Sequence, residues 1–88
     1  MKRDLDLIRE ILLFAENNCD GRQMPLADAS KFQNSKYHSV TRPVLREHIE
    51  LAQERGLLTA SHHSGGSHIH RLTWDGHDFL ANARSSQA

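Results

Sequence analysis

The 88-residue sequence predicts a single, mostly helical α+β domain, and three observations carry this expectation. An amphipathic helix with recognisable start and stop residues is expected from Thr41 to Gly56. A glycine-containing hairpin pattern follows it, and a further helix is expected to begin at Trp74. A helix, a short hairpin and a final helix in this order indicate a winged helix-turn-helix. We therefore expect residues 1–88 to form one winged-helix domain with a two-stranded wing and a C-terminal helix.

The central helix is defined by its ends. Thr41 is the expected N-cap, because its hydroxyl can accept an unpaired backbone N–H of the first turn. Pro43 falls in that turn, where its missing N–H costs nothing. Gly56 is expected to end the helix, since glycine enters the left-handed conformation without strain. The expected buried stripe consists of Leu45, Ile49 and Ala52.

A first helix is expected from Asp4 to about Asn17, because aspartates suit the positive N-terminal end of a helix. Its apolar residues form two neighbouring stripes. The first stripe consists of Leu5, Ile8, Leu12 and Ala15, and the second consists of Leu7, Ile11 and Phe14. Leu13 belongs to neither stripe. This surface is wider than one small core needs. Either several elements pack around the helix, or part of it forms a homodimer contact. The residues of that contact would be Leu7, Ile11, Leu13 and Phe14.

Residues 22–38 allow two interpretations, a short helix opened by Pro25 or a short edge strand. Proline excludes a central strand, because it lacks the N–H that a neighbouring strand would use. After the central helix, strand-like runs at 57–63 and 67–73 flank Ser64-Gly65-Gly66, a pattern typical of a tight hairpin. A two-residue turn there would pair His63 with His68.

The last helix is expected over residues 74–84, with Thr73 as its N-cap. Gly76 weakens a helix, so we expect it to permit a close approach of another element. The side chains expected to pack back on the first helix are Trp74, Phe79, Leu80 and Ala83.

The segment from Lys31 to Arg46 contains four basic residues and no acidic one, in a chain whose formal net charge is zero. In helix-turn-helix proteins, the loop and helix N-terminus at this place meet phosphates and base edges. The expected DNA contacts before and within the helix are Lys36, Tyr37, Ser39, Thr41, Arg42 and Arg46. The expected contacts of the wing are His62, His63, His68 and Arg71.

The second half of the central helix limits this interpretation. Glu47, Glu50 and Glu54 follow within two turns, and carboxylates lying near phosphates are repelled. Only the N-terminal turn of the helix is therefore expected to enter a DNA groove.

Histidines are concentrated between residues 62 and 77. The expected register places His63, His68 and His70 on one face of the hairpin, but a structural zinc site usually has four ligands, often cysteines. We therefore expect no metal, no cofactor and no small-molecule substrate. His48 is expected to be a partly buried, hydrogen-bonded side chain. No nucleophile-and-base pattern or phosphate-binding glycine loop occurs, so we expect no enzyme.

The single cysteine, Cys19, has no partner for an internal disulfide, which favours a reducing cytoplasm. Asp4 and Asp6 interrupt the basic and apolar pattern of a signal peptide. No stretch reaches the roughly 18 apolar residues that a membrane span needs.

Three segments of the chain resemble a family of small, uncharacterised bacterial and prophage proteins, a domain of unknown function. These segments are the opening Met-Lys-Arg-Asp-Leu-Asp, the central His-Ile-Glu-Leu-Ala-Gln-Glu-Arg-Gly-Leu-Leu and the closing Arg-Leu-Thr-Trp-Asp-Gly-His-Asp-Phe-Leu. Residues 52 and 58 depart from the central pattern, and residues 20–40 match poorly. The resemblance implies a winged-helix fold and a bacterial or phage origin, and it implies no catalytic residue.

Two functions are compatible with these observations. The first is a winged-helix protein that binds double-stranded DNA, such as a small bacterial or phage transcriptional regulator. The alternative is a protein-interaction module of a phage or mobile element that binds and inhibits a host protein or defence complex. The alternative rests on the zero net charge, the acidic half of the central helix and the broad apolar first helix.

Overall fold

The computed structural model describes residues 4–19, 22–32 and 34–85, of which 83–85 are described as backbone alone. It is an α+β fold with more helix than strand, as the sequence predicts. Its elements in chain order are α1 (Leu5–Asn18), β1 (Met24–Leu26), the 3₁₀ turns η1 (Ala29–Lys31) and η2 (Ser35–Tyr37), α2 (Arg42–Glu54), β2 (Leu58–His63), β3 (Gly66–Leu72) and α3 (Trp74–Ser85).

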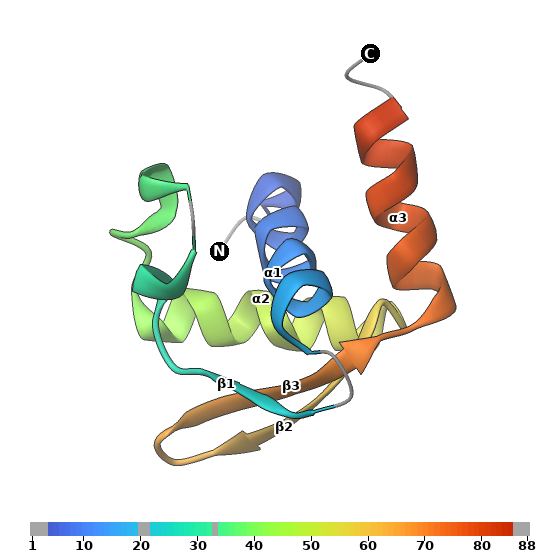
Figure 1. Cartoon of the computed structure of the whole chain (residues 1–88). Coiled ribbons are helices and arrows are strands. Elements are labelled where there is room, and N and C mark those ends of the chain that lie inside the picture. Colours follow the sequence, from blue (N-terminus) through green and yellow to red (C-terminus); the bar gives the residue numbers. More distant parts are fainter. Residues whose placement is uncertain (1–3, 20–21, 33, 86–88) are drawn as a thin grey trace.

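The strands form one antiparallel sheet in the order β1-β3-β2. Figure 1 shows α1 and α2 crossing above one face of this sheet, while α3 rises from one end of it. The core lies between the two helices and the sheet. No element that the structure describes covers the opposite, open face of the sheet.

Helix α1 begins at the expected place because its N-cap is satisfied. The Asp4 carboxylate accepts hydrogen bonds from the backbone N–H groups of Asp6 and Leu7. At the same point Asp4 N–H donates to Nε2 of His48, 3.0 Å away, and Nδ1 of His48 donates to Val44 O at 2.8 Å. His48 is therefore a buried, hydrogen-bonded side chain that joins α2 to the start of α1.

The homodimer contact expected on α1 needs correction. Leu7, Ile11 and Phe14 are only 1%, 0% and 8% exposed within a single chain, so they have almost no surface left for a partner. Only Leu13 is half-buried. Phe32, between η1 and η2, packs edge-on against Phe14, with ring centroids 6.5 Å apart. The broad apolar face of α1 thus serves several elements of its own chain.

Of the two interpretations of residues 22–38, the edge strand is confirmed for Met24–Leu26, whereas Ala29–Lys31 form a 3₁₀ turn. Pro25 lies in β1, which pairs only with β3. Met24 is opposite Ile69 in this pairing, and Leu26 is opposite Ser67. The expected two-stranded hairpin is therefore part of a three-stranded sheet.

Helix α2 has the expected ends, with one difference. Pro43 lies in its first turn, and Gly56 follows its C-cap with φ +78°. Thr41 occupies the N-cap position, but its side chain makes no capping hydrogen bond. Leu45, Ile49 and Ala52 are buried, as expected.

The register of the hairpin differs from the expected one. His63 pairs with Gly66, so Ser64 and Gly65 form the turn and His68 lies opposite Ser61. Gly66 has φ +139°, and a Cβ there would lie 2.9 Å from Cβ of Ala27. The close approach of the segment after β1 therefore places Gly66 in the strand. Because side chains alternate with a period of two, this two-residue shift leaves His63, His68 and His70 on one face.

Helix α3 is fixed at its start. Thr73 is the N-cap: its hydroxyl accepts the Gly76 N–H at 3.1 Å and donates to Gly56 O. A Cβ on Gly76 would lie 1.9 Å from Leu57 O, which confirms the expected close approach.

Among the α3 side chains expected to pack on α1, Leu80 is buried. Trp74 is 82% exposed, so the expectation that Trp74 packs on α1 is wrong. The side chain of Ala83 lies outside the described part. None of the helices described has the length and apolarity to span a membrane.

Candidate nucleic-acid interface

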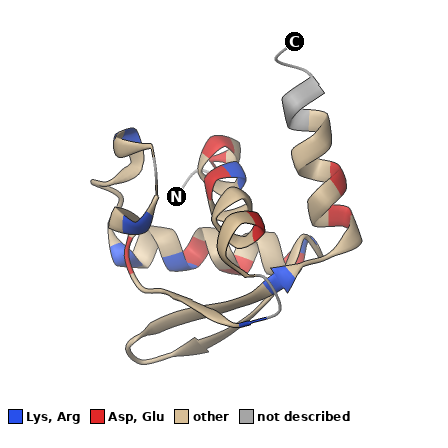
Figure 2. Ribbon diagram, viewed as in Figure 1, with Lys and Arg blue, Asp and Glu red and all other residues tan. Residues whose placement is uncertain are grey.

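Four basic side chains lie on η1, η2 and the first turns of α2, while the other basic side chains that the structure describes, those of Arg9, Arg22, Arg55 and Arg71, lie elsewhere in the fold. Figure 2 shows Lys and Arg around η1, η2 and the first turns of α2, whereas the acidic residues of α3 lie at the other end. Lys31 ends η1, Lys36 lies in η2, and both are exposed. Arg42 and Arg46 follow one turn apart on α2. The basic segment thus spans η1, η2 and the start of α2.

The first turn of α2 faces the turn of the hairpin. A groove of about 290 Å³ lies between them, with Arg42 and Arg46 on one side and residues 64–67 on the other. An Arg46 guanidinium nitrogen lies 3.5 Å from the backbone oxygen of His63 at the end of β2. Helix and hairpin therefore form one continuous surface, which we call the helix–hairpin surface (Arg42, Arg46 and residues 63–67).

Each of the two arginines also has a carboxylate near it. Arg42 lies 4.0 Å from Asp28, and Arg46 lies 3.7 Å from Glu50. Hydrogen bonds from the hydroxyl and backbone N–H of Ser30, with a smaller contribution from Arg42, hold the pKa of Asp28 below its ordinary value. Asp28 is therefore negative at neutral pH. The side chains of Arg42 and Arg46 remain 70% and 47% exposed, so both guanidiniums are accessible.

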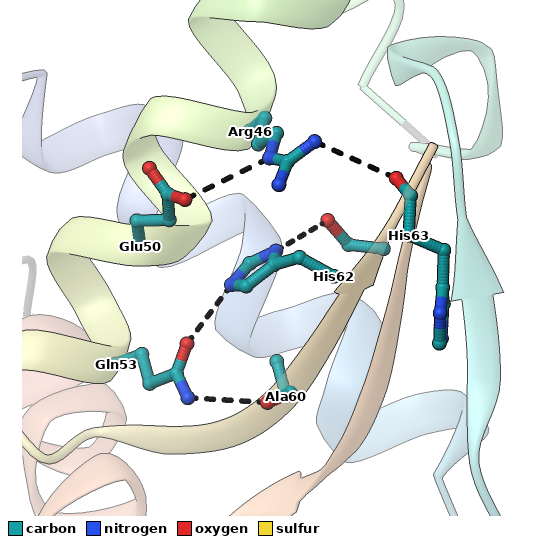
Figure 3. A network of polar contacts seen from close by, with 7 residues as sticks. Arg46, Glu50, Gln53, Ala60, His62 and His63 are labelled. Atoms are coloured by element: carbon teal, nitrogen blue, oxygen red, sulfur yellow. Dashed lines mark hydrogen bonds and ion pairs between the residues drawn. The ribbon is translucent and has the colours of Figure 1, made fainter. Parts of the chain in front are cut away.

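A polar network joins α2 to the hairpin behind Arg46 (Figure 3). The amide nitrogen of Gln53 donates to Ala60 O at 3.1 Å, so its oxygen is the acceptor for Nε2 of His62 at 3.0 Å. Nδ1 of His62 then accepts from the hydroxyl of Ser67 at 2.9 Å. Because both ring nitrogens are occupied, His62 fixes the hairpin to α2. Its expected role as a DNA contact is therefore corrected.

Tyr37 is a second correction. It is only 7% exposed and belongs to the core cluster, so its ring is not available to a nucleic acid. Burial raises the pKa of Tyr37, and the nearby carboxylates of Asp6 and Asp4 raise it further. The Nζ of Lys36 lies 5.6 Å from the centre of the ring, and Lys36 itself stays exposed.

Two further expected wing contacts lie away from the helix–hairpin surface. His68 is on the open face of the sheet, where its ring packs against that of His63 at 4.8 Å, and its Nδ1 is buried without a hydrogen-bond partner. Arg71 is opposite Thr59, at the end of the hairpin far from the turn. His63 borders Arg46 through its backbone oxygen alone, because its ring lies with that of His68 on the open face.

The remaining expected contacts, Ser39 and Thr41, are exposed in the segment that leads into α2. The histidines of the open face do not form a metal centre: within the described ranges, no three His, Cys, Asp or Glu side chains are placed to hold a metal ion. Ser61 lies between His63 and His70, its hydroxyl 3.4 Å from Nε2 of the first and 3.1 Å from Nε2 of the second.

Sequence reasoning missed two residues at this surface, Asp28 and Gln53. Asp28 caps η1 through Ser30, and an aspartate two residues before a serine is a local signal for such a turn. Its distance to Arg42 depends on how the chain returns from β1, which no local pattern shows. No sequence pattern distinguishes Gln53 as a residue that contacts the hairpin, because it is one of several polar residues on the exposed side of α2.

Comparisons with known proteins agree with this picture of a small domain without an assigned activity. The profile of a family described as "Hypothetical protein (DUF2513)" matches residues 2–88. A Haemophilus influenzae protein described as "Uncharacterized protein" is 34% identical over 89 residues, covering 97% of this chain and 70% of the relative. No solved structure matches the chain. The chain therefore belongs to the DUF2513 family of hypothetical proteins.

Proposed function

We propose that this chain is a winged-helix protein that binds double-stranded DNA and acts as a small bacterial or phage transcriptional regulator in the cytoplasm. The order of its elements supports the winged-helix assignment: α1, an edge strand, a turn segment, α2, a two-stranded hairpin and a final helix. In this arrangement α2 is the recognition helix and the β2–β3 hairpin is the wing.

The observation that carries the proposal is the helix–hairpin surface. Arg42 and Arg46 lie on the first turns of α2 beside the hairpin turn, and their guanidiniums are accessible. The side chain of Thr41 does not occupy the backbone N–H groups at this helix end. A helix N-terminus with free N–H groups attracts phosphate, and guanidiniums bind phosphate oxygens with two parallel hydrogen bonds.

The ion pairs of the two arginines do not prevent this binding. Arg42–Asp28 and Arg46–Glu50 are exposed pairs, which contribute little to stability, so phosphates can replace the carboxylates at little cost. Glu47 and Glu54, farther along α2, are exposed and would be repelled by the DNA backbone. We therefore propose that the first turn of α2 enters the major groove, while Lys31 and Lys36 contact the backbone beside it.

Fluorescence anisotropy with a labelled duplex of mixed sequence tests the proposal, at low salt and at near-physiological salt. We expect binding at low salt that weakens steeply as the salt concentration rises, because phosphate contacts release counterions. The absence of binding at low salt would refute the proposed function.

A second candidate is favoured by the acidic residues of α2. Glu47 and Glu54 are exposed, and neither forms an ion pair with a residue that the structure describes. Such a surface suits a basic patch on a partner protein, as in a phage or mobile-element module that inhibits a host protein or defence complex. This candidate predicts a complex with a purified basic host protein that Glu47→Lys with Glu54→Lys abolishes, and no affinity for DNA.

A further inference from the structure

Two large apolar side chains are exposed among the residues described, Trp74 at 82% and Leu5 at 50%. Trp74 is the first residue of α3, and Leu5 is the first residue of α1. Exposed tryptophan is unusual in a small monomeric domain, since burying its large ring contributes strongly to association. A surface that receives this side chain would explain its exposure.

The structure contains a groove of suitable size that is lined by both apolar and charged side chains. It has a volume of about 540 Å³ and lies between the start of α1, the end of α2 and α3. Leu5 borders it, and its other apolar lining residues are Ile8, Leu51, Leu57 and Phe79. Leu51 and Phe79 are half-buried, so their remaining surface faces this groove.

Arg55 at the groove is complementary in charge to the carboxylates beside Trp74. Arg55 and Glu54 lie at the groove, and Arg55 forms no ion pair within the part of the chain described. Asp75 and Asp78 are the exposed carboxylates beside Trp74 on α3, and they too are unpaired among the residues described. The start of α3 therefore presents an apolar ring with acidic neighbours, and the groove presents an apolar floor with a cation beside it. Glu54 adds an acceptor for the indole N–H.

We propose that two copies of this chain form a symmetric dimer in which Trp74 of each copy enters the groove of the other. A two-fold arrangement uses the same surface on both copies, so one contact supplies two tryptophans and two sets of Arg55–carboxylate pairs. This interface lies at the opposite end of the molecule from the helix–hairpin surface, so it leaves Arg42 and Arg46 free.

The experiment uses Trp74 as its own probe, because it is the single tryptophan of the chain. Its fluorescence emission and the mass from sedimentation equilibrium are measured over a wide range of protein concentration. We expect the mass to double as concentration rises and the emission to shift to shorter wavelength over the same range. A chain that stays monomeric with solvent-exposed emission throughout would overturn the proposal.

Substitutions at four exposed residues test the geometry. Trp74→Ala should raise the dimer dissociation constant about thirtyfold or more, the range of a buried tryptophan at an interface. Arg55→Asp should also weaken the dimer, and Asp75→Arg with Asp78→Arg should restore it in that background. Circular dichroism establishes that the variants remain folded. Dimerisation unchanged by Trp74→Ala, or a charge exchange that restores nothing, would contradict this interface.

Discussion

Replacing Arg42 and Arg46 together by alanine should weaken DNA binding in a way that depends on salt. Each phosphate contact contributes about −0.9 to the slope of log K against log salt concentration. Removing two contacts should therefore flatten this slope by about 1.8. Between 50 and 200 mM salt, the wild-type affinity should then fall about 12-fold more than that of the double variant. Both side chains are exposed, so the fold should be unaffected.

The assay is fluorescence anisotropy with the same duplex at several salt concentrations. The matched control is Arg22→Glu, which lowers the net charge by the same two units from one exposed position in the segment before β1. Equal slopes for wild type and the double variant would refute the reasoning. So would an equal loss in the control, because the effect would then come from total charge and not from the helix–hairpin surface.

The reciprocal substitution acts in the opposite direction. Asp28→Asn removes the carboxylate that lies 4.0 Å from Arg42. Since exposed ion pairs are weak, freeing the guanidinium should tighten DNA binding only modestly, by less than about 5-fold. The pKa of Asp28 lies below its ordinary value, so this carboxylate competes with phosphate at neutral pH. Weaker binding by Asp28→Asn would mean that Arg42 does not contact phosphate.

Three further predictions concern the fold. Gly76→Ala should lower the free energy of unfolding by about 1–3 kcal/mol in urea denaturation, because the new Cβ would lie 1.9 Å from Leu57 O. An unchanged free energy of unfolding would contradict this packing. His48→Leu should cost about 1–3 kcal/mol, since it leaves the Asp4 N–H without its acceptor, and an unchanged denaturation midpoint would speak against this bond. Burial raises the pKa of the Cys19 thiol, so less thiolate is present at pH 8. Alkylation of Cys19 should therefore be slower than alkylation of a small free thiol. Equal alkylation rates would show that the Cys19 side chain is accessible.

The helices were predictable because their signals are local. Asp4, Thr41 and Thr73 precede their helices directly, and Gly56 follows α2 at the left-handed position. The close approach at Gly76 was also predictable, since a glycine near the start of a helix usually has a packing reason. Each of these inferences needed only a few neighbouring residues.

Features that depend on distant contacts were not predictable. The predicted register, with His63 opposite His68, was wrong, and the close approach of Ala27 to Gly66 is a distant contact that the local turn pattern does not show. The second apolar stripe of α1 suggested a partner molecule, because nothing in the sequence shows that Phe32 and Tyr37 return to cover it.

The candidate site was predictable in part for the same reason. The basic segment is contiguous in sequence, so its residues lie on η1, η2 and the start of α2, which follow one another in the chain. The prediction of DNA contacts was wrong for residues whose accessibility depends on burial or on their position along the hairpin. Tyr37 turns into the core, His62 is tied to Gln53, and Arg71 lies far from the turn.

A residue-level map of DNA binding tests the central claim most directly. ¹H–¹⁵N correlation spectra of the wild-type chain, recorded at low salt during titration with a short duplex, show which backbone amides respond. The account predicts the largest shifts at residues 36–46 and in the hairpin turn at 63–66, with little change in α3. Spectra that stay unchanged, or shifts confined to residues 47–54 of α2, would contradict it.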